Sequence, residues 1–185
     1  MARELTAQLK FSEQWVYTST QTGAGTSENN PRAAAAESII QEFANGVGAD
    51  QAQRLWQSEG RVLAAAASET IDLYDFGALD IGGGAGKDQL GQALALSGIK
   101  GLVIWNLGTD PSPGNLIIGG EGSAAAWNSL FNGSDTATQV IQPGGLFVFI
   151  APTAAGYAVA DATNHLFKLA ADGGDVTYNI RVYGI

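Results

Sequence analysis

The chain has 185 residues, enough for one domain of ordinary size with a sizeable hydrophobic core. It contains no cysteine, which excludes disulfides and thiolate metal sites. The net charge is −9 and the Lys and Arg residues are scattered singly, so the composition disfavours binding to nucleic acid or anionic membranes. Only 15% of residues are charged, which suits a protein that lies against other subunits; a monomer with a nearly neutral surface is the alternative.

The N-terminal sequence lacks the basic start and apolar run of a signal peptide. The longest apolar windows, around Ile99 to Leu107 and Leu146 to Ala151, are long enough for a strand and too short for a membrane-spanning helix. We therefore expect a soluble protein that is made in the cytoplasm.

The first 45 residues are predicted to form an N-terminal arm. Leu5, Ala7, Leu9 and Phe11 alternate with polar residues, which indicates a strand, and the polar segment from Ser19 to Pro31 has little to bury. The sequence predicts a loop or an arm that becomes ordered against a neighbour.

Residues 32–45 contain the one helix candidate in the chain. Pro31 suits a first helical position, Gly46 suits a C-terminal stop, and the four alanines before Glu37 favour a helix. The competing interpretation is an edge strand around Ile39 and Ile40. We expect the helix by a small margin.

Residues 46–185 are predicted to form an antiparallel β-sandwich or jelly roll, because short apolar segments recur between turn residues. The expected strand segments in chain order are Leu55–Trp56, Arg61–Leu63, Thr70–Tyr74, Ile99–Leu107, Asn115–Ile118 and Gln139–Ile141. A flexible Gly-rich loop is expected at Ile81–Lys87. The fold class is therefore all-β, with at most one short helix.

The C-terminal 47 residues carry four more expected strands, interpreted as half of the sandwich. Leu146–Ile150 is apolar on both alternating sets, as in a strand buried on both faces. Tyr157–Val159 and His165–Leu169 follow it. Val176 to Tyr183 alternates between apolar and polar residues, which predicts one face on a core and one face toward water or a partner.

The sequence offers little catalytic chemistry. His165 is the only histidine and is interpreted as a strand residue. Gly82–Lys87 resembles a phosphate-binding loop, but Ile81 replaces the required first glycine and Asp88 stands where Ser or Thr should follow the lysine. Asp72, Asp75, Asp80 and Asp88 lack the spacing of a calcium loop. We expect no catalytic residues, no cofactor and no metal, and hence no enzyme.

The four tryptophans are the clearest candidates for contact residues. Trp105 lies within a strongly apolar strand and is expected in the core. Trp15, Tyr17, Trp56 and Trp127 are assigned to a partner interface, because aromatic residues in less apolar surroundings often anchor interfaces. Burial in the core and a sugar-stacking platform are the alternatives for the tryptophans in this group.

A series of turn and strand patterns resembles small structural proteins of tailed-bacteriophage virions. The patterns are Phe43–Ala52, Trp56, Arg61–Ala65, Glu69–Leu73, Ile99–Ile104, Ile118–Gly120, Pro143–Gly145, Ala151–Pro152, Gly156–Val159 and Tyr178–Ile180. They cover roughly residues 43–185. Several such proteins are β-sandwich or jelly-roll subunits that decorate or cement a capsid.

The resemblance implies a non-enzymatic decoration protein that bridges capsid subunits, commonly as a homotrimer. Its partners would be the major capsid protein or other virion proteins, and its location the capsid surface of the virion. A tail, neck or fibre-associated virion protein is the alternative, and a carbohydrate-binding jelly-roll module is a further one.

Overall fold

The computed structural model describes residues 5–17, 33–77, 85–88, 91–108 and 113–185. Over these ranges the protein is all-β, with strands joined by turns and one short 3-10 helix, η1, at Ser129–Phe131. The polar segment Ser19–Pro31 and most of the Gly-rich loop Ile81–Lys87 lie outside the described residues. The predicted fold class is confirmed.

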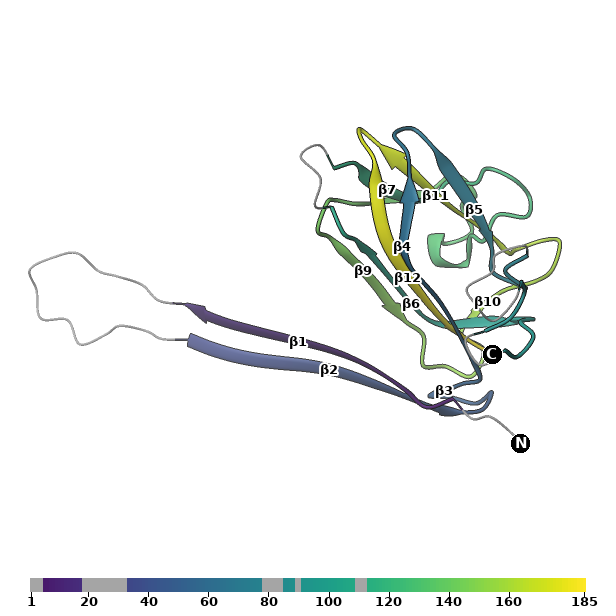
Figure 1. Cartoon of the computed structure of the whole chain (residues 1–185). Helices are drawn as coiled ribbons and strands as arrows, with labels where there is room; N and C mark the ends of the chain where they lie inside the picture. Colours follow the sequence, from purple (N-terminus) through teal and green to yellow (C-terminus); the bar gives the residue numbers. More distant parts are fainter. Residues whose placement is uncertain (1–4, 18–32, 78–84, 89–90, 109–112) are drawn as a thin grey trace, which may run out of the picture.

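Two sheets face each other to form a sandwich (Figure 1). The five-stranded sheet has the order β10-β6-β12-β4, with β9 also paired to β6, and the four-stranded sheet has the order β5-β11-β7-β8. The first sheet comprises β4 (Arg54–Leu63), β6 (Gly98–Asn106), β9 (Leu146–Ile150), β10 (Tyr157–Ala158) and β12 (Val176–Gly184). The second comprises β5 (Ser68–Asp72), β7 (Asn115–Gly119), β8 (Thr138–Ile141) and β11 (Leu166–Asp172).

The main core lies between these sheets. Each strand turns one alternating set of side chains inward, such as Ile104 and Ile180 from one sheet and Phe167 and Leu169 from the other. The four C-terminal strands do not form one half of the sandwich as expected, because β11 pairs with β5 and β7 in the opposite sheet. Strands that follow one another in the sequence therefore belong to different sheets of the sandwich.

The N-terminal segment forms a β-hairpin of β1 (Ala7–Tyr17) and β2 (Ala33–Asn45), and β3 (Gln51–Ala52) pairs with the end of β2. The expected helix over residues 32–45 is wrong. β2 pairs with β1 in an unbroken antiparallel register from Ala7↔Phe43 to Tyr17↔Ala33, and this ladder outweighs the helix propensity of the alanines. The two strands extend away from the sandwich (Figure 1).

Candidate functional site

Two of the predicted contact residues lie in the main core. Trp56 is fully buried and stacks on Phe76 with ring centroids 4.5 Å apart. Trp127 is 2% exposed, and its indole nitrogen donates a hydrogen bond to the Ala158 carbonyl at 2.9 Å. Their assignment to a surface interface is therefore wrong for this chain. Both residues occur on irregular or weakly apolar segments in the sequence, but the facing sheet supplies the apolar surroundings that the local sequence lacks.

The other two predicted contact residues belong to the hairpin. Trp15 and Tyr17 occupy backbone positions opposite Ala35 and Ala33 in the β1–β2 register. Their side chains lie outside the described part of the structure, so their assignment to a partner interface stays a prediction.

Trp105 is on the surface, contrary to its expected place in the core. Its side chain is 48% exposed, whereas its neighbour Ile104 is fully buried. A strand directs successive side chains to opposite faces, so the apolar character of the whole segment concealed the alternation. Directly opposite Trp105 in the neighbouring strand stands Leu146, which is 52% exposed. Leu146–Ile150 is therefore a strand as predicted, but it is not buried on both faces.

Trp105 and Leu146 belong to what we call the outer face, the side of the five-stranded sheet that points away from the core. From the strand registers, its residues are Leu55 and Gln57 of β4, Gly101, Val103 and Trp105 of β6, Leu146, Val148 and Ile150 of β9, and Asn179, Arg181 and Tyr183 of β12. One half of this face, on β6 and β9, is mainly apolar. The other half, on β12 and β4, carries the polar residues.

The base of the hairpin packs on one end of the outer face and forms a second, smaller core. Leu5, Phe43, Ala52 and Tyr183 are buried there, and Ala7, Leu55, Val103 and Ile150 pack around them. Phe43 is fully buried and stacks on Tyr183 with centroids 5.9 Å apart. Burial raises the pKa of Tyr183 above its ordinary value, with Arg181 opposing the effect.

Lys100 fastens the hairpin base to the sandwich through hydrogen bonds. It is fully buried, and its ammonium group donates to the carbonyl oxygens of Gly48, Thr153 and Ala154. Gly48 belongs to the turn after β2, and the other two carbonyls belong to the loop after β9. Desolvation lowers the pKa of Lys100, while Asp50 opposes this shift. The three carbonyl acceptors compensate for removing the ammonium group from water.

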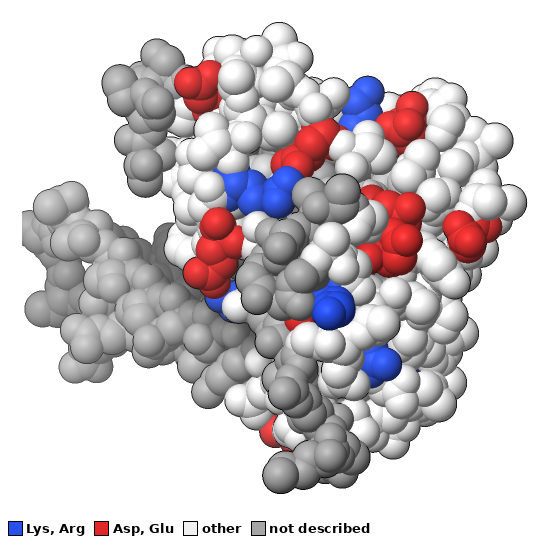
Figure 2. All heavy atoms as spheres, turned by 45° about the vertical axis from the view of Figure 1, so that its right-hand side comes forward, with Lys and Arg blue, Asp and Glu red and all other residues white. Residues whose placement is uncertain are grey.

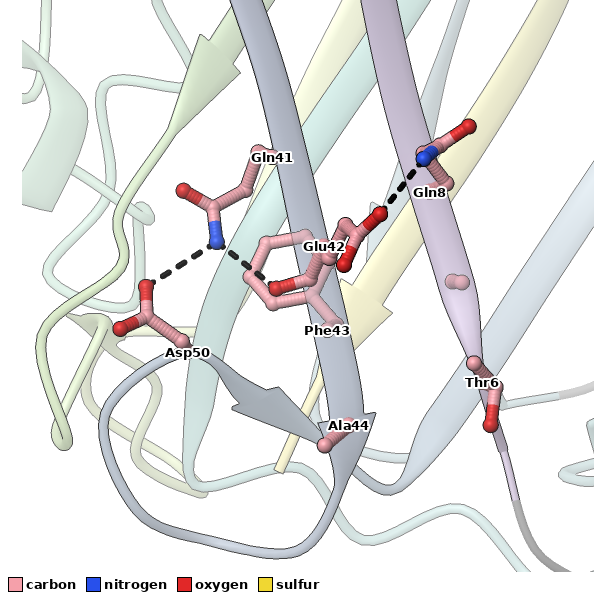
Figure 3. A pocket seen from close by; sticks show the side chains of 8 residues that line it. Thr6, Gln8, Gln41, Glu42, Phe43, Ala44 and Asp50 are labelled. Carbon is pink, nitrogen blue, oxygen red and sulfur yellow. Dashed lines mark hydrogen bonds between the residues drawn. The ribbon is translucent and has the colours of Figure 1, made fainter.

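An open hollow of about 850 Å³ lies beside the hairpin base, lined by Thr6, Ala7, Gln8, Gln41, Glu42, Phe43, Ala44 and Asp50 (Figure 3). The Gln41 side-chain amide donates to Asp50 Oδ1 at 3.0 Å, and the Gln8 amide donates to Glu42 Oε1 at 2.7 Å. Amides and carboxylates of the lining thus hydrogen-bond to one another. The lining contains no histidine, serine or cysteine.

A partly buried polar network ties the two sheets together at a different edge of the sandwich. Arg61 of β4 forms an ion pair with Glu69 of β5, and the Tyr178 hydroxyl of β12 donates to the same carboxylate. Burial and the hydrogen bond to Glu69 raise the pKa of Tyr178 well above its ordinary value. The hydrogen bond to Glu69 likewise raises the pKa of Arg61. This network holds one strand of the second sheet against two strands of the first.

The remaining ionisable groups are dispersed. His165 Nδ1 lies 3.0 Å from Asp72 Oδ2 just before β11. Within the described ranges, no three His, Asp or Glu side chains gather in a way that could hold a metal ion. Figure 2 shows small groups of charged side chains separated by broad uncharged surface, in keeping with the low charge content.

Among comparisons with known proteins, no family model matches this chain, and no curated protein is significantly similar to it. In the part of the chain that is described, no helix is both long enough and apolar enough to cross a bilayer.

Proposed function

We propose that this protein is a non-enzymatic structural subunit of a tailed-phage virion, which decorates and cements the capsid by bridging capsid subunits. The observation that carries this proposal is the projecting β-hairpin. Its base is fastened to the sandwich by Phe43, Tyr183 and Lys100, while the paired strands continue far beyond these contacts.

A two-stranded ribbon that stands alone in water is at best marginally stable. The eleven register pairs of β1 and β2 correspond to about 36 Å of strand at roughly 3.3 Å per residue, so most of the hairpin extends past its base. A ribbon of this length gains stability by lying on a neighbouring protein. The binding free energy of such a bridge comes from the apolar surface that the contact buries, and a cement protein joins its neighbours through contacts of this kind.

The alternation within the hairpin supports the same role. Leu5 and Ala7 pack on the outer face, and the odd-numbered set of β1 continues with Leu9, Phe11, Glu13, Trp15 and Tyr17, which are apolar or aromatic except for Glu13. The partners of the hairpin would be the major capsid protein or other virion proteins, and the protein would act as a homotrimer on the capsid surface. Repeating a weak contact three times in one particle raises the avidity through effective concentration.

The test uses shells purified without this protein, to which the full chain is added back. The variant Phe11→Glu/Trp15→Glu places two charges in the odd-numbered set of β1, and Ser12→Glu/Gln14→Glu places the same two charges in the even-numbered set of the same strand. We expect the first variant to lose most shell binding and the second to retain it. Equal binding by both variants would contradict a role for this set of hairpin residues.

Copy number in purified virions distinguishes the capsid from the tail. A protein that decorates a shell is present in on the order of hundreds of copies, because it repeats with the shell's symmetry. A number on the order of ten or fewer, measured by quantitative gel densitometry, would reassign the protein to the tail, neck or fibre.

A further inference from the structure

The exposed end of the outer face is an apolar patch on regular sheet. Trp105 and Leu146 stand opposite each other in the β6–β9 register and are 48% and 52% exposed. Val103 and Val148 form the next outward pair and are partly exposed. Two large apolar side chains that are half exposed and adjacent mark a contact site more strongly than isolated ones do.

The opposite end of the same face already binds a β-ribbon. Leu5, Ala7 and Phe43 of the hairpin base lie against Tyr183, Leu55, Val103 and Ile150. Val103 therefore links the covered end to the exposed patch, which begins one register pair further along β6. The chain's own hairpin does not continue along this face, because its strands diverge from the sheet (Figure 1).

The hairpin has a composition that matches the exposed patch. Its odd-numbered set continues from the residues that pack at the base to Leu9, Phe11, Glu13 and Trp15 on β1, which pair with Gln41, Ile39, Glu37 and Ala35 on β2. The set on β1 is thus apolar except for Glu13, and the set on β2 is mixed. The outer face has the same division between an apolar half on β6 and β9 and a mixed half on β12 and β4.

We propose that the hairpin of one molecule lies on the outer face of a second copy, over Trp105, Leu146 and Val148. Each subunit then gives its hairpin to one neighbour and accepts the hairpin of another, which closes into a ring. This inference builds on the assembly role proposed above and names a second copy as the partner of this surface. It concerns self-association in solution and is tested at Trp105, which the shell-binding test leaves unchanged, so a chain that binds shells but stays monomeric contradicts this inference alone.

The test mixes two variants that are defective in different halves of the contact. Trp105→Glu damages the face and leaves the hairpin intact, whereas Phe11→Glu/Trp15→Glu damages the hairpin and leaves the face intact. Native mass spectrometry and light scattering should show an oligomer for the unaltered chain and self-association weakened by about 30-fold or more for each variant alone. A mixture of the two should form a one-to-one heterodimer and nothing larger, because only one productive contact remains.

Val140→Glu is the matched control for Trp105→Glu, since Val140 is 46% exposed but belongs to β8 of the other sheet. It should assemble like the unaltered chain.

Three outcomes would overturn the inference. The unaltered chain is a monomer at concentrations up to the millimolar range, which would mean that the hairpin serves another partner. The Trp105→Glu variant assembles normally, which would place the contact elsewhere. The mixture of defective variants stays monomeric, which would indicate that the hairpin folds onto its own sheet.

Discussion

The strongest single test of how the hairpin is held concerns Phe43. Replacing it by alanine removes a fully buried aromatic ring that stacks on Tyr183, and leaves a cavity between the hairpin base and the outer face. Buried Phe-to-Ala changes cost about 3–5 kcal/mol. Because this core is small and separate from the main one, we expect the loss to fall on the attachment of the hairpin rather than on the sandwich.

Amide hydrogen exchange measures this loss of stability at the hairpin base directly. The Ala44 amide donates to the Asp50 carbonyl at 3.0 Å, and the Asp50 amide donates to the Pro152 carbonyl at 2.8 Å, so both report on the base. In Phe43→Ala their exchange should accelerate by about two to three and a half orders of magnitude, or up to the rate of an unprotected amide. The amides of β6 and β12 should keep their protection.

Phe43→Leu retains most of the apolar volume and should cost less than about 1.5 kcal/mol. Unchanged exchange at Ala44 and Asp50 in Phe43→Ala would show that the ring does not hold the hairpin. An equal loss of protection throughout β6 and β12 would show that the base and the sandwich unfold as one unit.

Two further predictions concern the sandwich. Because the pKa of Tyr178 is raised, the folded state keeps the phenol proton at pH values above about 10, where the unfolded chain loses it. The stability that this proton contributes is complete below about pH 10 and falls as the pH rises further, by up to about 1.4 kcal/mol per pH unit. In Tyr178→Phe the urea midpoint should therefore decline less steeply at alkaline pH. The Asn106 side chain donates to the Gly114 and Ile141 carbonyls at 3.0 and 3.1 Å, so Asn106→Leu should lower the free energy of unfolding by about 2–4 kcal/mol; a stable variant would show that these carbonyls find other donors.

Much of the strand pattern could be predicted from local sequence. Alternation over residues 176–183 predicted β12, and short apolar segments between turns predicted β6, β7, β8 and β9. These predictions succeeded because the two-residue period and the turn residues are local properties of the chain. The expected helix over residues 32–45 failed, because the competing ladder with β1 involves residues far away in the sequence.

The candidate site was harder to predict, because aromatic residues were judged by their sequence neighbours. Trp56 and Trp127 lie beside polar or small residues, yet the opposite sheet buries them. Trp105 lies among apolar residues, yet its position in the alternation of β6 directs it outward. No local sequence signal marks Trp105 as exposed, because the polar Asn106 beside it is the residue that is buried, together with Ile104.

The sequence by itself determined the all-β class of this protein, its low charge and the division of its strands by turns. Each of these features depends on composition and on residues close together in the chain. Only the tertiary structure decided which strands share a sheet, which tryptophans are buried, and that the first strand forms a ribbon with residues 33–45. These features depend on pairing and burial between distant segments, and such contacts leave no local pattern from which they can be predicted.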